Sequence, residues 1–232
     1  RSSAASVVYK RQLLMSLNIE MLDNYAKNED GIVYQVDKNP IDYDKEYVNT
    51  RYVKYGELPT YMAHLRLGNI IGSLSRVPSS ILDVGYGDGS FLKVCNNIIT
   101  NCYGYDVSSY PAPEGCEVVS SMTDNVYDVV TFFDSLEHFE DIEFVKDLKC
   151  RAVCISVPHC HYTSDEWFEK WKHRRPDEHL WHFDKDSLVN FMERMGYIMV
   201  SCSNLEDTIT KNPHQEETNI LTCVFKKLGI LL

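Results

Sequence analysis

Residues 83–90 are the feature of this sequence that most restricts its fold. They read Asp-Val-Gly-Tyr-Gly-Asp-Gly-Ser and lie between an apolar run typical of a strand and a segment with helical spacing. Gly85 and Gly87 allow a sharp turn close to a ligand, and Gly89 relieves crowding at the start of the helix. Ligands of open α/β sheets bind at such turns. The turn therefore predicts a ligand-binding α/β sheet, although glycine turns can also serve only to redirect a chain.

The spacing of these glycines differs from that of dinucleotide-binding proteins. Their GxGxxG fingerprint would require a glycine at position 90, where this chain has Ser90. A pyrophosphate binds bare helix N–H groups, whereas a zwitterionic amino acid needs a carboxylate near its ammonium group. Asp83 can supply that carboxylate. Asp106 ends the next predicted strand, where an acidic side chain can accept hydrogen bonds from ribose hydroxyls, and Val107 would then lie against adenine.

Short apolar runs alternate with helical segments from residue 80 onward, which is typical of βαβ units around a mostly parallel sheet. The expected strands span residues 81–84, 102–106, 117–120, 127–133, 152–157, 197–202 and 219–225. The expected helices between them span 90–98, 140–148 and 185–195. The sequence therefore predicts an α/β domain.

The first 78 residues have a different pattern. Leu14, Leu17, Met21, Leu22 and Tyr25 recur at helical spacing, and a second helical pattern covers 62–74 after Pro59. The tyrosine-rich stretch between them, 34–55, fits either a lid or a surface connection. We predict an N-terminal helical extension over 1–78, which could dock a protein partner, and a cofactor-binding domain over 79–232.

Composition excludes several classes of protein. A net charge of −11 argues against wrapping of a long phosphate backbone, although a small basic patch stays compatible with it. No apolar run approaches the roughly 20 residues of a membrane span. The eight cysteines include no CxxC pair, and Cys154, Cys202 and Cys223 lie in predicted strands as small hydrophobic residues. We expect reduced thiols and a cytoplasmic protein.

Four successive motifs, ILDVGYGDGSF, YGYDVS, YDVVTFFDSLEHF and VCISVPH, resemble those of class I S-adenosylmethionine-dependent methyltransferases. The later EHLWHFDKDSLVNFMERMGY is similar to the small-molecule branch that includes ubiquinone-biosynthesis O-methyltransferases. The resemblance implies a Rossmann-like seven-stranded sheet with an antiparallel last strand and S-adenosyl-L-methionine as cofactor. It assigns Asp83, Gly85, Tyr86, Gly87 and Gly89 to the methionine part, Asp106 and Val107 to adenosine, Ser121 and Met122 to the flanks of adenine, and Asp134 and Ser135 to closure of the site. Tyr86 stands where the family commonly has a small residue.

Six of the eight histidines lie between residues 138 and 182. This stretch includes the loops that we expect to face a substrate. Histidine is the side chain best suited to accept a proton near neutral pH. His138, His159 and His179 are the candidate catalytic residues, with capping or core roles as the alternative. Metal-ligand types also occur at His159, Cys160, His161, His179 and His182, and more weakly at Asp134, Glu137, Asp177 and Glu178. They complete no recognised set, so we predict no metal site.

A basic and aromatic segment contrasts with the acidic chain. Lys170, Lys172, Arg174 and Arg175 alternate with Trp167, Phe168, Trp171 and His173. Either this is a solvated helix face, or Trp171, Arg174 and Arg175 bind an anionic acceptor. The sequence thus favours methylation of an oxygen or nitrogen of a small or nucleotide-like acceptor. The alternatives are a methyltransferase of RNA ends or caps and a catalytically inactive cofactor-binding scaffold.

Overall fold

A seven-stranded sheet forms the centre of the protein, whose computed structural model describes residues 22, 24–41, 56–210 and 217–229. The strands are Ser80–Val84 (β3), Asn101–Tyr105 (β4), Glu117–Val118 (β5), Val126–Phe133 (β6), Lys149–Pro158 (β7), Tyr197–Ser203 (β9) and Ile220–Lys227 (β10). Their order is β5-β4-β3-β6-β7-β10-β9. Neighbours are parallel from β5 to β7, and β10 is antiparallel to β7 and β9. The predicted fold is confirmed.

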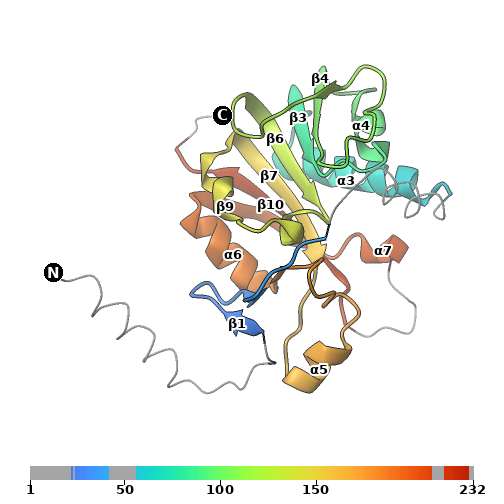
Figure 1. Ribbon diagram of the computed structural model, residues 1–232. Coiled ribbons are helices and arrows are strands. Elements are labelled where there is room, and N and C mark those ends of the chain that lie inside the picture. The colour runs from blue at the N-terminus through green and yellow to red at the C-terminus, as the bar shows by residue number, and fades with distance from the viewer. Residues whose placement is uncertain (1–21, 23, 42–55, 211–216, 230–232) are drawn as a thin grey trace.

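Helices cover both faces of this sheet (Figure 1). Helices α3 (Leu58–Leu74) and α4 (Ser90–Cys95) pack on one face, where Leu67 and Leu92 share a core with Ile81. Helix α6 (Lys185–Arg194) covers the other face, where Phe191 packs in a core with Phe225. Side chains alternate between the faces of a strand, so the apolar runs of the central strands serve both cores. The helices predicted at 62–74, 90–98 and 185–195 are present, and α4 ends early, at Cys95.

The helix predicted at 140–148 is wrong. The segment forms a short 3-10 helix, η3 (Glu143–Asp147). Ile142, Val145 and Leu148 are buried at a spacing of three residues, and the amides of Val145 and Leu148 donate to the carbonyl groups of Ile142 and Val145. A period of three residues fits a 3-10 helix, in which every third side chain faces the same way.

A second, small sheet joins the N-terminal region to the segment before α6. Strands β1 (Tyr25–Lys27), β2 (Val33–Gln35) and β8 (Trp181–His182) form it with antiparallel pairing. Tyr25, predicted to be helical, lies in β1, where its ring packs edge-on against Phe168 at a centroid distance of 5.0 Å. Tertiary packing therefore overrides the helical spacing at this residue. Leu14, Leu17 and Met21 of the predicted first helix lie outside the described residues, as do residues 42–55 of the tyrosine-rich stretch.

Two short helices complete the described elements, α5 (Asp165–Lys170) and α7 (Asp207–Thr210). The eight cysteines are free thiols; Cys154 and Cys223 are buried as expected, whereas Cys202 is half-buried. None of the helices in the described part of the chain is long and apolar enough to cross a membrane.

Asp128 ties the segment after α3 to strand β6. Its carboxylate accepts hydrogen bonds from the amide (2.7 Å) and hydroxyl (2.6 Å) of Ser79 and pairs with Arg76 (3.2 Å) and Arg151 (3.3 Å). Burial alone would raise the pKa of this carboxyl, but the donors of Arg76 and Ser79 outweigh it and lower the pKa to about 2. The charged form of Asp128 therefore stabilises the folded chain.

Replacing Asp128→Asn should lower the free energy of unfolding near neutral pH by about 1–3 kcal/mol, because buried donors lose a charged acceptor. A carboxyl whose pKa is lowered by folding contributes stability above its unfolded pKa, and this is lost as pH falls through the folded value. The difference in free energy of unfolding between wild type and variant, measured from urea unfolding curves, should therefore decrease as the pH falls from about 4 to about 2. Asp124→Asn, at an exposed position, is the control. A difference in free energy of unfolding that does not change with pH would contradict the stabilising role of the charged Asp128.

Candidate functional site

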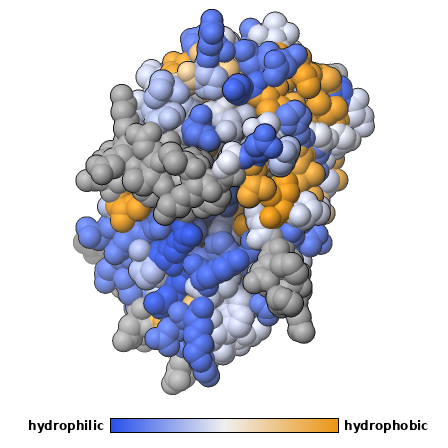
Figure 2. All heavy atoms as spheres, turned by 90° about the vertical axis from the view of Figure 1, so that its right-hand side faces the viewer, coloured by the Kyte–Doolittle hydropathy of each residue, from blue (hydrophilic) through white to orange (hydrophobic). Residues whose placement is uncertain are grey.

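A cavity of about 990 Å³ lies beyond the carboxyl ends of β3, β4 and β6. Strand β3 has β4 on one side and β6 on the other, which is the switch point where open α/β sheets bind ligands. The chain bounds the cavity with the loops after these strands, the start of α3, residues 172–179 and the region of α7. Figure 2 views the side of the molecule on which α3, α4 and α7 lie; hydrophobic residues gather there toward the upper right, among hydrophilic ones, and the lower part is mainly hydrophilic.

The glycine turn adopts the conformation that its sequence predicts. Gly85, Gly87 and Gly89 all have positive φ, at 78°, 54° and 76°. At Gly85 a side chain is also excluded by space, since a Cβ atom would lie 2.7 Å from the Cβ of Ser135. Ser135 follows β6, and its hydroxyl donates to the carbonyl of Val84 at 2.7 Å. The loops after β3 and β6 therefore touch at a position that only glycine fits.

Asp106 connects the glycine turn to the end of β4. One oxygen accepts from the amide of Gly87 at 2.9 Å and the other from the amide of Ser108 at 2.8 Å. Each carboxylate oxygen has two lone pairs, so each retains acceptor capacity toward the cavity. Val107, beside it, lines the cavity and is 64% exposed. This arrangement suits the predicted contacts with ribose and adenine.

Asp83 is buried at the floor of the cavity. The hydroxyl of Thr131 donates to it at 2.7 Å, yet burial raises the pKa of this carboxyl to about 7. A cationic group binding nearby would restore its charged form. The glycine turn accommodates the large side chain of Tyr86. Its ring packs against Gly104, which has no side chain to obstruct it, and its hydroxyl donates to the carbonyl of Tyr110.

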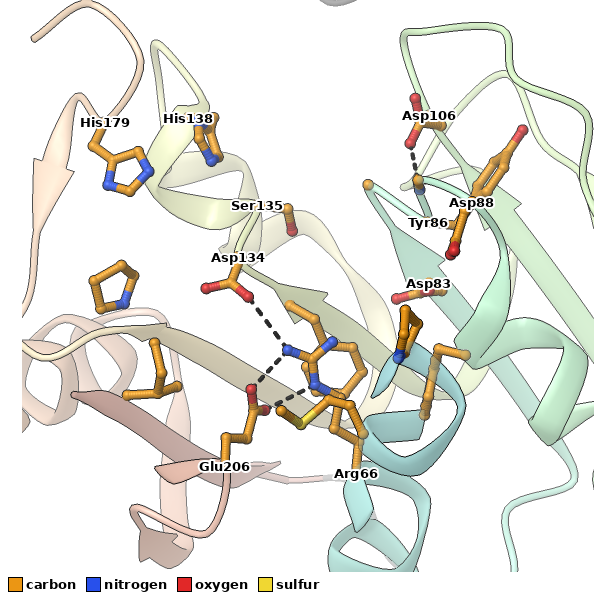
Figure 3. A pocket seen from close by; sticks show the side chains of 18 of the residues that line it. Arg66, Asp83, Tyr86, Asp88, Asp106, Asp134, Ser135, His138, His179 and Glu206 are labelled. Atoms are coloured by element: carbon orange, nitrogen blue, oxygen red, sulfur yellow. Dashed lines mark hydrogen bonds and ion pairs between the residues drawn. The ribbon is translucent and has the colours of Figure 1, made fainter. Parts of the chain in front are cut away.

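Arg66, on α3, is a site residue that the sequence did not indicate. Its guanidinium donates to both oxygens of Glu206, at 2.8 and 2.7 Å, and to Asp134 at 3.3 Å (Figure 3). It also lies over the ring of Phe133, 4.3 Å from its centroid. Arg66 and Glu206 belong to no motif, and 140 residues separate them, so only the folded chain brings them together.

His138 and His179 lie across the cavity from Asp83 and Asp106 (Figure 3). Their ring centroids are 4.7 Å apart, with His138 at the end of the 3-10 helix η2 (Leu136–His138). Burial and the neighbouring His138 lower the pKa of His179, so its imidazole is neutral. Glu137, which precedes His138 in the chain, is fully buried, and burial together with Asp134 raises the pKa of its carboxyl well above the ordinary value.

His159, the third candidate base, does not line the cavity. Its Nδ1 lies 2.6 Å from the hydroxyl of Thr218, and its ring stands 3.9 Å from that of His161. Burial lowers the pKa of His159 to about 4. Its predicted catalytic role therefore has no support from its position and stays a prediction.

The remaining candidates divide between the cavity and its surroundings. Asp134, Ser135 and Arg175 line it, whereas Gly89, Ser121, Met122, Trp171 and Arg174 do not. Trp171 stacks on Trp167 with a centroid distance of 5.5 Å, and Arg174 lies over the ring of Tyr25. Lys172, which the sequence placed in the basic segment without a role, lines the cavity beside Arg175.

Residues 57–201 match a family described as methyltransferase domain. The chain belongs to this family. No curated protein sequence matches it. The methyltransferase resembles a Burkholderia thailandensis 1,6-didemethyltoxoflavin-N1-methyltransferase (TM-score 0.56, 13% identity, covering 88% of this chain and 99% of that one). It also resembles a chain of the complex between the Haloferax volcanii Trm112 activator and a putative methyltransferase (TM-score 0.56, 12% identity, covering 81% of this chain and 99% of that one). A third similar structure is the methyltransferase domain of bacterial CtHen1-C (TM-score 0.50, 18% identity, covering 71% of this chain and 98% of that one).

At these identities the solved structures show that the methyltransferase shares their fold. The family match covers more than half of the chain and includes α3, so the helix that carries Arg66 lies within the matched region. The family match identifies the protein as a methyltransferase, as its motifs predicted. The finer resemblance to ubiquinone-biosynthesis enzymes stays a prediction, as does a domain boundary at residue 78.

Replacing Gly85→Ala should weaken binding of S-adenosylhomocysteine by at least about tenfold, because positive φ and the contact with Ser135 together cost more than about 1.4 kcal/mol. Isothermal titration calorimetry measures the change. Gly68→Ala is the matched control, since this exposed glycine of α3 has open space around its Cβ position. Equal affinity in the Gly85 variant and wild type would show that the turn does not contact the cofactor.

Proposed function

We propose that this methyltransferase transfers the methyl group of S-adenosylmethionine to an oxygen or nitrogen atom of a small or nucleotide-like, anionic acceptor. One observation carries the proposal: a single cavity joins the glycine turn and Asp106 to a second half bounded by His138, His179, Lys172 and Arg175. A donor and an acceptor could therefore be held face to face, and such positioning supplies much of the rate of a two-substrate reaction.

The donor half fits S-adenosylmethionine in shape and in charge. Gly85 lets the loop after β6 pack against the turn, Asp106 offers oxygens to ribose hydroxyls, and Asp83 is a buried carboxylate at the place predicted for the ammonium group. When bound, the cofactor supplies a methyl group activated by a positive sulfur. The acidic side chains of this half suit that cation.

The acceptor half contains positively charged side chains, which favour binding of an anionic substrate. Within the described residues Lys172 forms no ion pair, whereas Arg175 pairs with Glu178 at 2.9 Å. His138 donates from Nδ1 to the carbonyl of Glu178 (2.7 Å), which leaves its Nε2 as the nitrogen with a lone pair. His138 and His179 could thus orient the acceptor or accept its proton. The Burkholderia structure, which contains 1,6-didemethyltoxoflavin with S-adenosylhomocysteine, supports a small acceptor.

Wild-type protein should bind S-adenosylmethionine and S-adenosylhomocysteine in calorimetry, and Asp106→Ala should weaken both by about 10- to 100-fold. Hydrogen bonds to a charged acceptor contribute roughly 1.5–3 kcal/mol, which corresponds to this range. Asp124→Ala, at an exposed site outside the cavity, should bind normally. A folded wild-type sample that binds neither compound would refute the proposal and favour an inactive scaffold.

Replacing Lys172→Glu should lower kcat/KM for phosphorylated acceptors by about tenfold or more, because the change reverses a charge beside the bound anion. Transfer of labelled methyl groups to matched phosphorylated and unphosphorylated nucleosides measures this effect. Lys170→Glu is the control, since Lys170 is exposed outside the cavity and, among the described residues, pairs with Glu166 alone. Methylation of RNA oligonucleotides alone would replace this proposal by the RNA alternative.

A further inference from the structure

Three potential metal ligands meet on the acceptor side of the cavity. Glu137, His138 and His179 each present a ligand atom, and these atoms lie within 4.8 Å of one another. No other group of three such side chains occurs among the residues that the structure describes. The cluster combines His179 and Glu137, two of the ligand types noted in the sequence, with His138, whereas His159 and His161 lie elsewhere.

Glu137 and His179 have buried polar atoms that no donor or acceptor of the described residues satisfies. Within the described part of the chain, both carboxylate oxygens of Glu137 and the Nδ1 atom of His179 are buried without a hydrogen bond. Leaving such atoms unsatisfied costs free energy, and buried polar side-chain atoms are nearly always paired. The exceptions in a native protein point to a missing proton, water or ion.

The chain holds the cluster in place from two segments. The amide of Leu180 donates to the carbonyl of Glu137 at 2.8 Å, and the indole of Trp181 donates to the carbonyl of Phe139 at 2.7 Å. The hydrogen bond from His138 Nδ1 to the carbonyl of Glu178 fixes the ring with Nε2 as its lone-pair atom. Metal-binding histidines characteristically donate their second nitrogen in this way. The ligands are therefore oriented before any ion arrives.

We propose that Glu137, His138 and His179 bind a divalent transition-metal ion, whose remaining coordination positions face the cavity and take oxygen atoms of the acceptor. Two imidazoles and one carboxylate suit Zn²⁺, Mn²⁺, Fe²⁺ or Co²⁺, whereas Mg²⁺ and Ca²⁺ prefer oxygen ligands. Three protein ligands leave positions open, which is typical of metal sites that bind substrates. The role of the acceptor in this inference rests on the proposed function.

The location of the cluster makes this role possible. Helix η2 follows Ser135 directly, and Ser135 touches the glycine turn. His138 and His179 both line the cavity that the donor half shares. An acceptor oxygen bound to the ion would lie beside the donor, and the histidines would act as ligands instead of bases. This inference replaces the prediction of no metal site made from the sequence.

Titration with Co²⁺ tests the site without an acceptor. Wild type should bind one Co²⁺ per chain and develop visible d–d absorption bands, and Glu137→Gln and His179→Asn should each bind at least about tenfold more weakly. His64→Asn is the matched control, because His64 is exposed on α3, outside the cavity, and its Nδ1 hydrogen bonds to the carbonyl of Thr60 in the preceding turn of the chain. Zn²⁺ should also raise the melting temperature of wild type and of the control, but not of the two cluster variants.

Two results would overturn the inference. One is the absence of Co²⁺, Mn²⁺ and Zn²⁺ binding by folded wild type, which would leave Glu137 a buried protonated acid. The other is equal Co²⁺ affinity in wild type and both cluster variants. S-adenosylhomocysteine binding, measured on the same samples, separates the two proposals: cofactor binding without metal binding refutes only the metal site, and metal binding without cofactor binding refutes only the proposed function.

Discussion

The contact between Gly85 and Ser135 determines how the site is built. It brings the loop after β3 against the loop after β6, with no room for a side chain on the glycine. Because β3 is the central strand at the switch point, this contact fixes where the cavity begins. Ser135 in turn starts the short segment that carries Glu137 and His138. The donor and acceptor halves are therefore positioned by the same pair of loops.

Arg66 adds a second constraint, from a helix outside the strand–turn–helix unit. It reaches from α3 to Glu206, which is almost fully buried and also accepts from the hydroxyl of Ser156 on β7. Such a pair costs desolvation, and removing one partner would leave a buried charge unpaired. The pair thus connects α3, β7 and the segment before α7 below the cavity, and Asp134 extends it to the loop after β6.

Local signals in the sequence predicted most of the fold. The strands, α6 and the glycine turn all follow from apolar runs, helical spacing and glycines that act within a few positions. Apart from the 3-10 helix at 143–147, whose three-residue spacing is local, the failures arise where distant contacts decide. Tyr25 became a strand residue because β2 pairs with β1 and its ring packs on Phe168, and Glu206 joined the site through Arg66. The meeting of His179 with Glu137 likewise depends on a hydrogen bond between two segments.

The buried carboxylates of this protein differ in how far the chain satisfies them. Asp128 receives hydrogen bonds and ion pairs from three residues, and its pKa falls. Asp83 has Thr131 as its hydrogen-bond donor and its pKa rises, while both oxygens of Glu137 lack a hydrogen bond within the described residues. A carboxylate that serves only the fold gains most when the protein itself supplies its donors. Asp83 lies at the floor of the donor half and Glu137 belongs to the cluster on the acceptor side, so a cation bound in either half of the cavity can complete the nearby carboxylate.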